Sequence, residues 1–109
     1  MRTIAFAAAA CAFAMAGCRS PAAHHEPQTF HIEMRGMQYV PASLNVHRGD
    51  VVIWTNRDLV PHTATSAGWF DSGSIAPGDS WTYVIREPVE LDYLCSFHPT
   101  MKGQLFGEK

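Results

Sequence analysis

The chain has 109 residues and a formal net charge of −2 at pH 7, with 47% hydrophobic and 17% charged residues. A chain of this size is long enough for one domain with a single hydrophobic core and too short for several. It has no cluster of Lys and Arg and no basic stripe with interleaved aromatic residues, so we expect no nucleic-acid partner.

The first 17 residues have the pattern of a signal peptide. Arg2 gives a positive start, and residues 4–16 form an apolar run that only the neutral thiol of Cys11 interrupts. This run is too short for a stop-transfer helix and is typical of the core of a signal peptide. It ends in Met15-Ala16-Gly17-Cys18, which resembles a bacterial lipoprotein cleavage site. We therefore predict a periplasmic protein that touches the membrane only through a lipid on Cys18.

The alternative is an ordinary secretory signal cut between Ala16 and Ala23, which would give a soluble protein outside the cytoplasm. In either case residues 18–28 are rich in Pro, Ala and Ser and offer almost nothing to bury, so they form a flexible tether. The pair His24 and His25 lies in this tether. A solvated linker pair is the preferred interpretation, and weak capture of metal is the alternative.

From residue 29 onward, short runs of alternating or β-branched residues are separated by Gly, Pro, Asn and Asp, as in strands and turns. The predicted strands lie near residues 30–34, 44–46, 51–54, 74–75, 81–85, 91–95 and 104–106. No helical periodicity follows the signal, and no internal repeat occurs. The pattern predicts an all-β domain over residues 29–109, an antiparallel β-sandwich of seven or eight strands.

Cys95 is the one cysteine left in this domain, and a lone thiol in an oxidising compartment calls for a reason. A buried cysteine that packs as a small hydrophobic residue is the simple alternative. However, His98 and Met101 follow Cys95 at steps of three residues, and His62 lies on the loop after the 51–54 strand. A thiolate, two imidazoles and a weak thioether are donors that suit copper. We predict that these four residues hold one ion that alternates between Cu(I) and Cu(II).

A single copper ion with this ligand set moves electrons and leaves no obvious place for a substrate, so we predict an electron carrier and not an enzyme. Rigid strands would keep the ligands in place during the redox change. Near the metal we expect Asn56 to hydrogen-bond the Ser96 hydroxyl or the region of Cys95, with an ordinary turn residue as the alternative. Pro99 is expected to stiffen the ligand loop.

Apolar residues are expected to surround the metal, namely Pro61, Phe97, Pro99 and Met37. If the ring edge of His98 reaches the surface among them, it is the natural route for electrons, and a small patch there suits brief docking of a redox partner. The remaining histidines, His31 and His47, are expected at the surface. For Met34 and Met37 core packing is preferred over a copper-acquiring pair.

Two segments resemble the cupredoxin family, closest in pattern to amicyanins and plastocyanins. They are MQYVPASLNVHRGDVVIWTNRDLVPHT (residues 37–63) and YLCSFHPTMKGQL (residues 93–105), and the resemblance covers about three quarters of the chain. It implies a Greek-key sandwich and a type 1 copper site with His62, Cys95 and His98 as ligands and Met101 as the long axial one. It further implies a monomer that shuttles single electrons in the periplasm between redox proteins such as cytochromes or a periplasmic dehydrogenase.

Other functions fit the sequence less well. A periplasmic carrier or chaperone that delivers copper to an oxidase is the main alternative, but it needs exchangeable ligands rather than a tuned redox site. A copper oxidase or nitrite reductase needs a second copper centre, and the chain has neither a His-x-His pair nor a second cysteine beside Cys95. A dinuclear copper centre fails for the same lack of a second thiolate, and methionine is a poor ligand for zinc.

Overall fold

The computed structural model describes residues 3–5, 17 and 25–109. Cys18, His24 and most of the predicted signal peptide lie outside these residues. Within the described part of the chain there is no helix, and therefore none that is long and apolar enough to cross a membrane. The strands are β1 (Thr29–Arg35), β2 (Gln38–Val40), β3 (Ser43–His47), β4 (Val51–Asn56), β5 (Thr65–Ser66), β6 (Phe70–Asp71), β7 (Ser80–Val84), β8 (Glu90–Cys95) and β9 (His98–Glu108).

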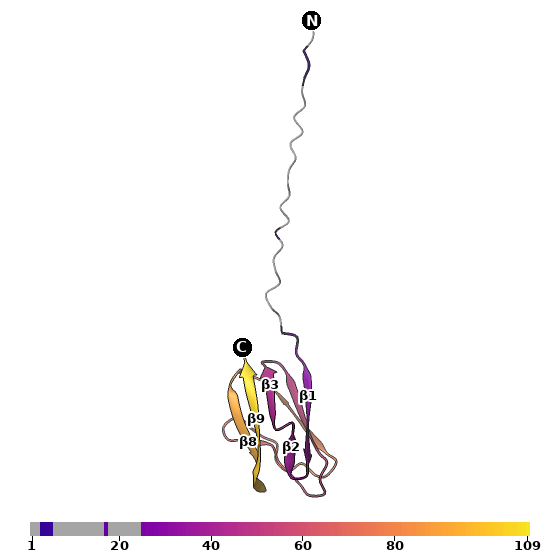
Figure 1. Cartoon of the computed structure of the whole chain (residues 1–109), viewed down its shortest axis with the longest axis vertical. Coiled ribbons are helices and arrows are strands. Elements are labelled where there is room, and N and C mark those ends of the chain that lie inside the picture. The colour runs from indigo at the N-terminus through magenta and orange to yellow at the C-terminus, as the bar shows by residue number, and fades with distance from the viewer. Residues whose placement is uncertain (1–2, 6–16, 18–24) are drawn as a thin grey trace.

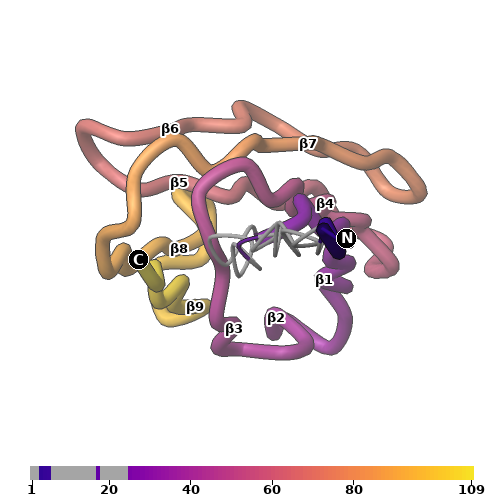
Figure 2. The backbone as a smooth tube through the Cα atoms, turned by 90° about the horizontal axis from the view of Figure 1, so that it is seen from above, coloured from indigo at the N-terminus to yellow at the C-terminus, as the bar shows by residue number. Residues whose placement is uncertain are grey.

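The strands form two sheets that face each other (Figures 1 and 2). One sheet has the order β2-β1-β4-β7, and the other has the order β3-β9-β8-β5-β6. The predicted all-β sandwich is confirmed. The expectation of purely antiparallel pairing is wrong for two pairs, because β1 lies parallel to β4 and β3 lies parallel to β9. Parallel partners require a crossover, and here the chain passes through the opposite sheet between them.

The alternation along the strands explains which side chains fill the space between the sheets. Ile32 and Met34 of β1, Val52 and Trp54 of β4, Leu91 and Tyr93 of β8, and Leu105 of β9 point inward and are buried. Gly103 is also an inward position, and a Cβ there would overlap the ring of Tyr93. Because every second side chain of a strand points to the same face, the apolar residues at these positions meet in one aromatic and aliphatic core.

Three short strands escape the sequence pattern, and one strand is longer than predicted. β2, β5 and β6 have two or three residues each, and the predicted strand at 74–75 is an isolated bridge between His62 and Ile75. β9 begins at His98 rather than at residue 104. His98 and Met101 therefore lie on a strand and not in a free loop, and only Ser96 and Phe97 separate β8 from β9.

Candidate metal centre

Three of the four predicted ligands, His62, Cys95 and His98, meet at one end of the sandwich. Cys95 ends β8 and follows Tyr93 as the next inward position, while Met101 is the inward position before Gly103 on β9. Both side chains are buried, as is His62, whereas His98 is partly exposed. Cys95 and Met101 thus continue the series of inward-facing core positions to the end of the sandwich. For this reason the alternation typical of a strand and the spacing typical of metal ligands occur in the same segment.

The distances between donor atoms match those around a single ion. Cys95 Sγ lies 3.7 Å from His62 Nδ1 and 3.6 Å from His98 Nδ1, and one donor atom of each of the three residues lies within 4.8 Å of the others. Metal–sulfur and metal–nitrogen bonds of about 2.3 and 2.0 Å at angles of 110–120° place the two donors about 3.5–3.8 Å apart. The donor set and its spacing therefore fit one copper ion, with Met101 as a further buried neighbour.

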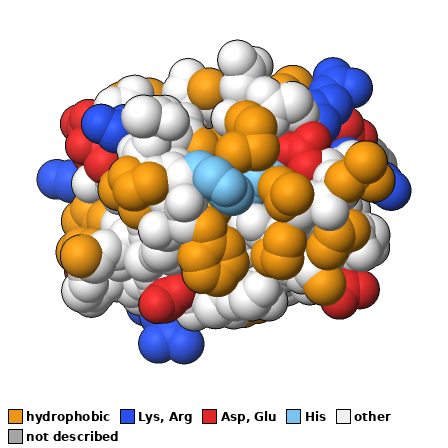
Figure 3. Space-filling view, turned by 90° about the horizontal axis from the view of Figure 1, so that it is seen from below, with side chains coloured by type: hydrophobic (Ala, Val, Ile, Leu, Met, Phe, Trp, Pro, Cys, Tyr) orange, Lys and Arg blue, Asp and Glu red, His pale blue; other side chains and the backbone are white. Residues whose placement is uncertain are grey.

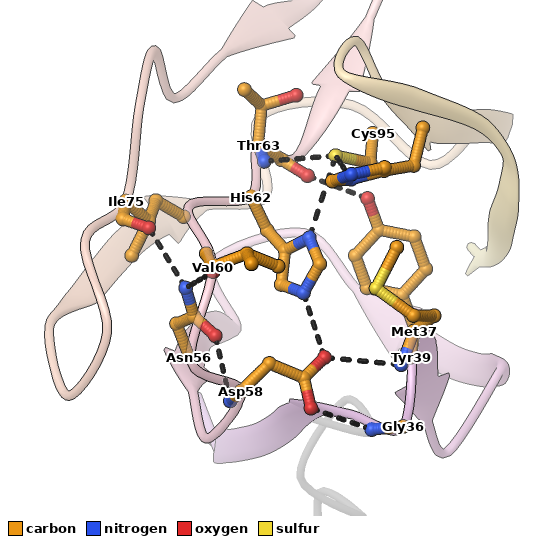
Figure 4. A network of polar contacts seen from close by, with 11 residues as sticks. Gly36, Met37, Tyr39, Asn56, Asp58, Val60, His62, Thr63, Ile75 and Cys95 are labelled. Carbon is orange, nitrogen blue, oxygen red and sulfur yellow. Dashed lines mark hydrogen bonds and ion pairs between the residues drawn. The ribbon is translucent and has the colours of Figure 1, made fainter.

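His62 is fixed through its backbone and through its ring, which lies between Cys95 and Asp58 in Figure 4. Its backbone N–H donates to the carbonyl of Ile75 at 3.1 Å, and the Ile75 N–H donates back at 2.7 Å. Its ring nitrogen Nε2 lies 2.7 Å from Asp58 Oδ2. A carboxylate can only accept, so Nε2 carries the hydrogen and the lone pair is on Nδ1, the nitrogen that faces Cys95. Asp58 therefore orients the ring and selects the tautomer that can bind metal.

Asp58 also ties this ligand to the β1–β2 turn. Its carboxylate accepts the N–H of Gly36 at 2.7 Å and of Met37 at 3.0 Å, and both residues have φ of 61°. Burial alone would raise the pKa of Asp58, but the hydrogen bonds from His62, Met37 and Gly36 outweigh it and hold this pKa below its usual value. The carboxylate is thus ionised beside His62, the candidate ligand.

Thr63 connects the two ligand segments. Its backbone N–H donates to Cys95 Sγ at 3.3 Å, and its hydroxyl accepts the Ser96 N–H at 2.8 Å. The carbonyl of Thr63 in turn accepts a hydrogen bond from the buried hydroxyl of Tyr39. A donor to the sulfur stabilises its anionic form and influences the potential of a copper bound there.

The expected hydrogen bond of Asn56 is wrong in its partner. The amide of Asn56 donates to the carbonyls of Val60 at 2.8 Å and Ile75 at 2.9 Å, and its oxygen accepts the N–H of Asp58 at 2.9 Å. The Ser96 hydroxyl donates instead to Thr65 at 3.2 Å. Asn56 is fully buried and fixes the loop that carries His62, so its contribution to the ligand set is indirect.

The remaining predicted neighbours divide between core and surface. Met34 is fully buried, as core packing predicts, but Met37 is 41% exposed at the β1–β2 turn, so core packing is wrong for it. Pro99 is exposed at the start of β9. His31 is exposed and His47 is partly exposed. Sequence reasoning missed Asp58 and Thr63; the position of Asp58 four residues before a metal-binding histidine was the available signal.

Comparison with known proteins identifies the family. The model of the cupredoxin-like domain matches residues 5–106. The chain belongs to the cupredoxin-like family. It is 30% identical over 123 residues to amicyanin-alpha of Methylorubrum extorquens AM1, covering 99% of this chain and 100% of that one. It is 26% identical to the amicyanin of Paracoccus denitrificans, over 71% of this cupredoxin and 63% of that protein.

Solved structures place the fold in the same group. A reduced amicyanin variant superposes with a TM-score of 0.70 at 26% identity, covering 73% of this cupredoxin and 82% of that chain. A second amicyanin variant, in its Cu(I) form, gives a TM-score of 0.70 at 24% identity over the same shares. The amicyanin-like pattern read from the sequence is thereby confirmed.

Proposed function

We propose that this cupredoxin is a periplasmic carrier of single electrons that holds one copper ion. The ligands proposed are His62, Cys95, His98 and Met101. The observation that carries the proposal is the pair of sulfur–nitrogen distances around Cys95, 3.6 and 3.7 Å, in a cluster of one thiol and two imidazoles of which only His98 is partly exposed. Copper bound there supplies the one-electron redox couple, and the protein supplies a fixed set of donors.

The protein's contribution is rigidity. Cys95 and His98 are paired with each other at the β8–β9 hairpin, and His62 is paired with Ile75. The backbones of Cys95, His98 and His62 are therefore fixed by pairing, and Asp58 fixes the ring of His62. Electron transfer is fast when the ligands move little between the Cu(I) and Cu(II) states, and a rigid scaffold limits this movement.

The surface at this end suits brief docking. In Figure 1 the end where β9 begins faces down, and Figure 3, seen from below, shows a histidine surface surrounded by hydrophobic side chains with few charges near its centre. The exposed hydrophobic residues of the loops there are Met37, Leu59, Val60 and Phe97. Leu59 is 95% exposed. Covering a leucine side chain with a partner is favourable, because it removes apolar surface from water. A transient complex with a cytochrome or a periplasmic dehydrogenase would cover this patch around His98, and the protein would otherwise remain a monomer.

The amino-terminal features complete the proposal. A signal peptide over residues 1–17 with a lipid on Cys18 would anchor the domain to the membrane, and residues 18–28 would let it reach its partners. Mass spectrometry of the protein isolated from membranes tests this directly. A mature chain that begins after Cys18 and carries no lipid would indicate ordinary secretion instead.

The copper site is tested by adding Cu(II) to the purified apoprotein and recording its visible and electron spin resonance spectra. We expect an intense thiolate-to-copper band that Cys95→Ser abolishes. The matched control is His31→Gln, which removes an exposed histidine of β1 and should leave the band unchanged. Copper binding without this band, and unaffected by Cys95→Ser, would favour a copper carrier with exchangeable ligands and refute the electron-carrier proposal.

A further inference from the structure

A second cluster of metal-binding side chains lies at the opposite end of the domain. One donor atom each of His25, His47 and Asp50 lies within 4.8 Å of the others. His47 ends β3, Asp50 lies in the turn before β4, and His25 lies on the segment that leads into β1. Figure 1 shows this segment entering at the end where β3 and β9 finish. β9 spans the 11 residues from His98 to Glu108, about 30 Å of extended chain, so the two clusters cannot share an ion.

Asp50 is the fixed element of this cluster. Its side chain has no exposed surface, and each of its oxygens accepts one backbone N–H: Oδ1 that of Gln28 at 2.9 Å and Oδ2 that of His47 at 2.7 Å. These two bonds hold the plane of the carboxylate and leave lone pairs on both oxygens. His25 Nε2 lies 2.7 Å from Oδ1. The carboxylate is therefore a preformed anionic ligand with one imidazole already beside it.

His47 lies between this carboxylate and that of Glu108. Its Nε2 lies 3.2 Å from Glu108 Oε2, and its Nδ1 is the ring nitrogen nearer to Asp50. Nδ1 lies 3.9 Å from Asp50 Oδ2, too far for a hydrogen bond. The gap between these two atoms is wide enough for a cation that both would bind. Two ligands of one ion lie about 3–4 Å apart when each bond is about 2.0–2.2 Å.

We propose that His25, His47 and Asp50 form a second site for a divalent transition-metal ion, with Glu108 as the carboxylate that orients His47. Two imidazoles and a carboxylate without sulfur suit Zn²⁺ and, more strongly, Cu²⁺. The rings of His25 and His47 are stacked, with centroids 3.8 Å apart, and His25 Nε2–H donates to Asp50 Oδ1. Binding therefore requires His25 to give up this hydrogen bond and to turn a ring nitrogen that carries no hydrogen toward the ion. The ion would clamp the leading segment to the β3–β4 turn, at the base of the proposed tether.

The test uses copper-loaded, reduced protein, in which the proposed electron-transfer site is already occupied. Titration of Zn²⁺ by calorimetry should show one further equivalent, and the ring-proton NMR signals of His25 and His47 should shift while those of His31 do not. His47→Gln and His25→Gln should each abolish this equivalent. Glu108→Gln should weaken this binding by about tenfold, the usual effect of removing a carboxylate that orients a ligand histidine. None of these variants should alter the visible spectrum of the oxidised protein.

Two results would overturn the inference. The absence of a further equivalent would mean that the cluster is an ion-pair network only. Loss of Zn²⁺ in His24→Gln and His25→Gln, but not in His47→Gln, would assign the binding to the neighbouring histidines of the tether. Because the copper spectrum is recorded on the same samples, failure of the second site is distinguishable from failure of the first.

Discussion

The Asp58→Asn variant tests how the fold prepares His62 for metal. In the wild type, Asp58 Oδ1 accepts the Gly36 N–H, and Oδ2 accepts the Met37 N–H and the His62 Nε2–H. An asparagine in its better orientation keeps its oxygen on Met37 and His62 but turns its NH2 toward the Gly36 N–H. One hydrogen bond is thereby lost, and two change from charge-assisted to neutral.

The magnitude follows from these three bonds. Hydrogen bonds to a charged group contribute about 1.5–3 kcal/mol and neutral ones about 0.5–1.5 kcal/mol, so with the lower value of each range the change in a dry site is about 3.5 kcal/mol. The side chain of Asp58 is 15% exposed, and water that reaches it reduces the expected loss to about 2 kcal/mol. The metal should be affected separately, because removing a carboxylate that orients a ligand histidine lowers metal affinity by about 10–100-fold.

Urea unfolding of the apoprotein and copper competition with a chelator measure the two effects. With a slope of about 1–1.5 kcal/mol per M for a domain of this size, the midpoint should fall by about 1–2 M. Asp79→Asn is the matched control, because it removes the same charge from an exposed aspartate whose side chain makes no hydrogen bond among the described residues. If the two variants unfold at the same midpoint and bind copper equally, the carboxylate does not hold the ligand.

Gly103→Ala places a methyl group against the ring of Tyr93, so the free energy of unfolding measured in urea should fall by about 1–3 kcal/mol. The control Lys102→Ala changes an exposed side chain and should alter it by no more than about 0.5 kcal/mol. Equal effects of the two variants would mean that the Tyr93 ring moves aside freely. Burial raises the pKa of Tyr39 and Tyr93, so above about pH 10 both phenols stay neutral in the folded protein but ionise in the unfolded chain. The free energy of unfolding should therefore be constant in this respect below about pH 10 and fall above it by about 1.4 kcal/mol per pH unit for each tyrosine. Tyr39→Phe should halve this alkaline slope in the apoprotein, and an unchanged slope would contradict the reasoning. Leu59→Ser should leave the thermal midpoint unchanged because the side chain is 95% exposed, yet slow electron exchange with a cytochrome partner in stopped-flow mixing; an unchanged rate would place docking elsewhere.

The strands that could be predicted are those with at least two inward positions. β4 and β8 bury alternate residues, so their period of two is visible in the sequence. β5 and β6 have two residues each and depend on pairing with β8 and with each other, which no local pattern records. The start of β9 could not be predicted because Pro99 and Gly103 are both typical of loops rather than strands. Only the structure shows that position 103 has no room for a side chain, because the ring of Tyr93 lies against it.

The candidate ligand set could be proposed from the sequence because its chemistry is rare and its spacing is local. Cys95, His98 and Met101 lie within one hairpin, and only His62 had to be brought from a distant loop. The atoms that position these ligands carry much less signal. Thr63 acts through its backbone N–H, which every residue except proline offers. Asp58 is one of several aspartates in turns, and only the fold shows that its carboxylate reaches His62.

The same inward alternation that fills the core also determines where the metal can lie. Tyr93 and Cys95 are consecutive inward positions of β8, and Gly103 and Met101 are consecutive inward positions of β9. A shift of β8 by one residue would turn Cys95 to the outside, and a shift of β9 would do the same to Met101, together with the core residues of that strand. The free energy that fixes the register of the core therefore also fixes the donors. The apoprotein should for this reason hold its ligands close to their metal-bound positions, and binding of copper should add to stability by mass action rather than by folding the site.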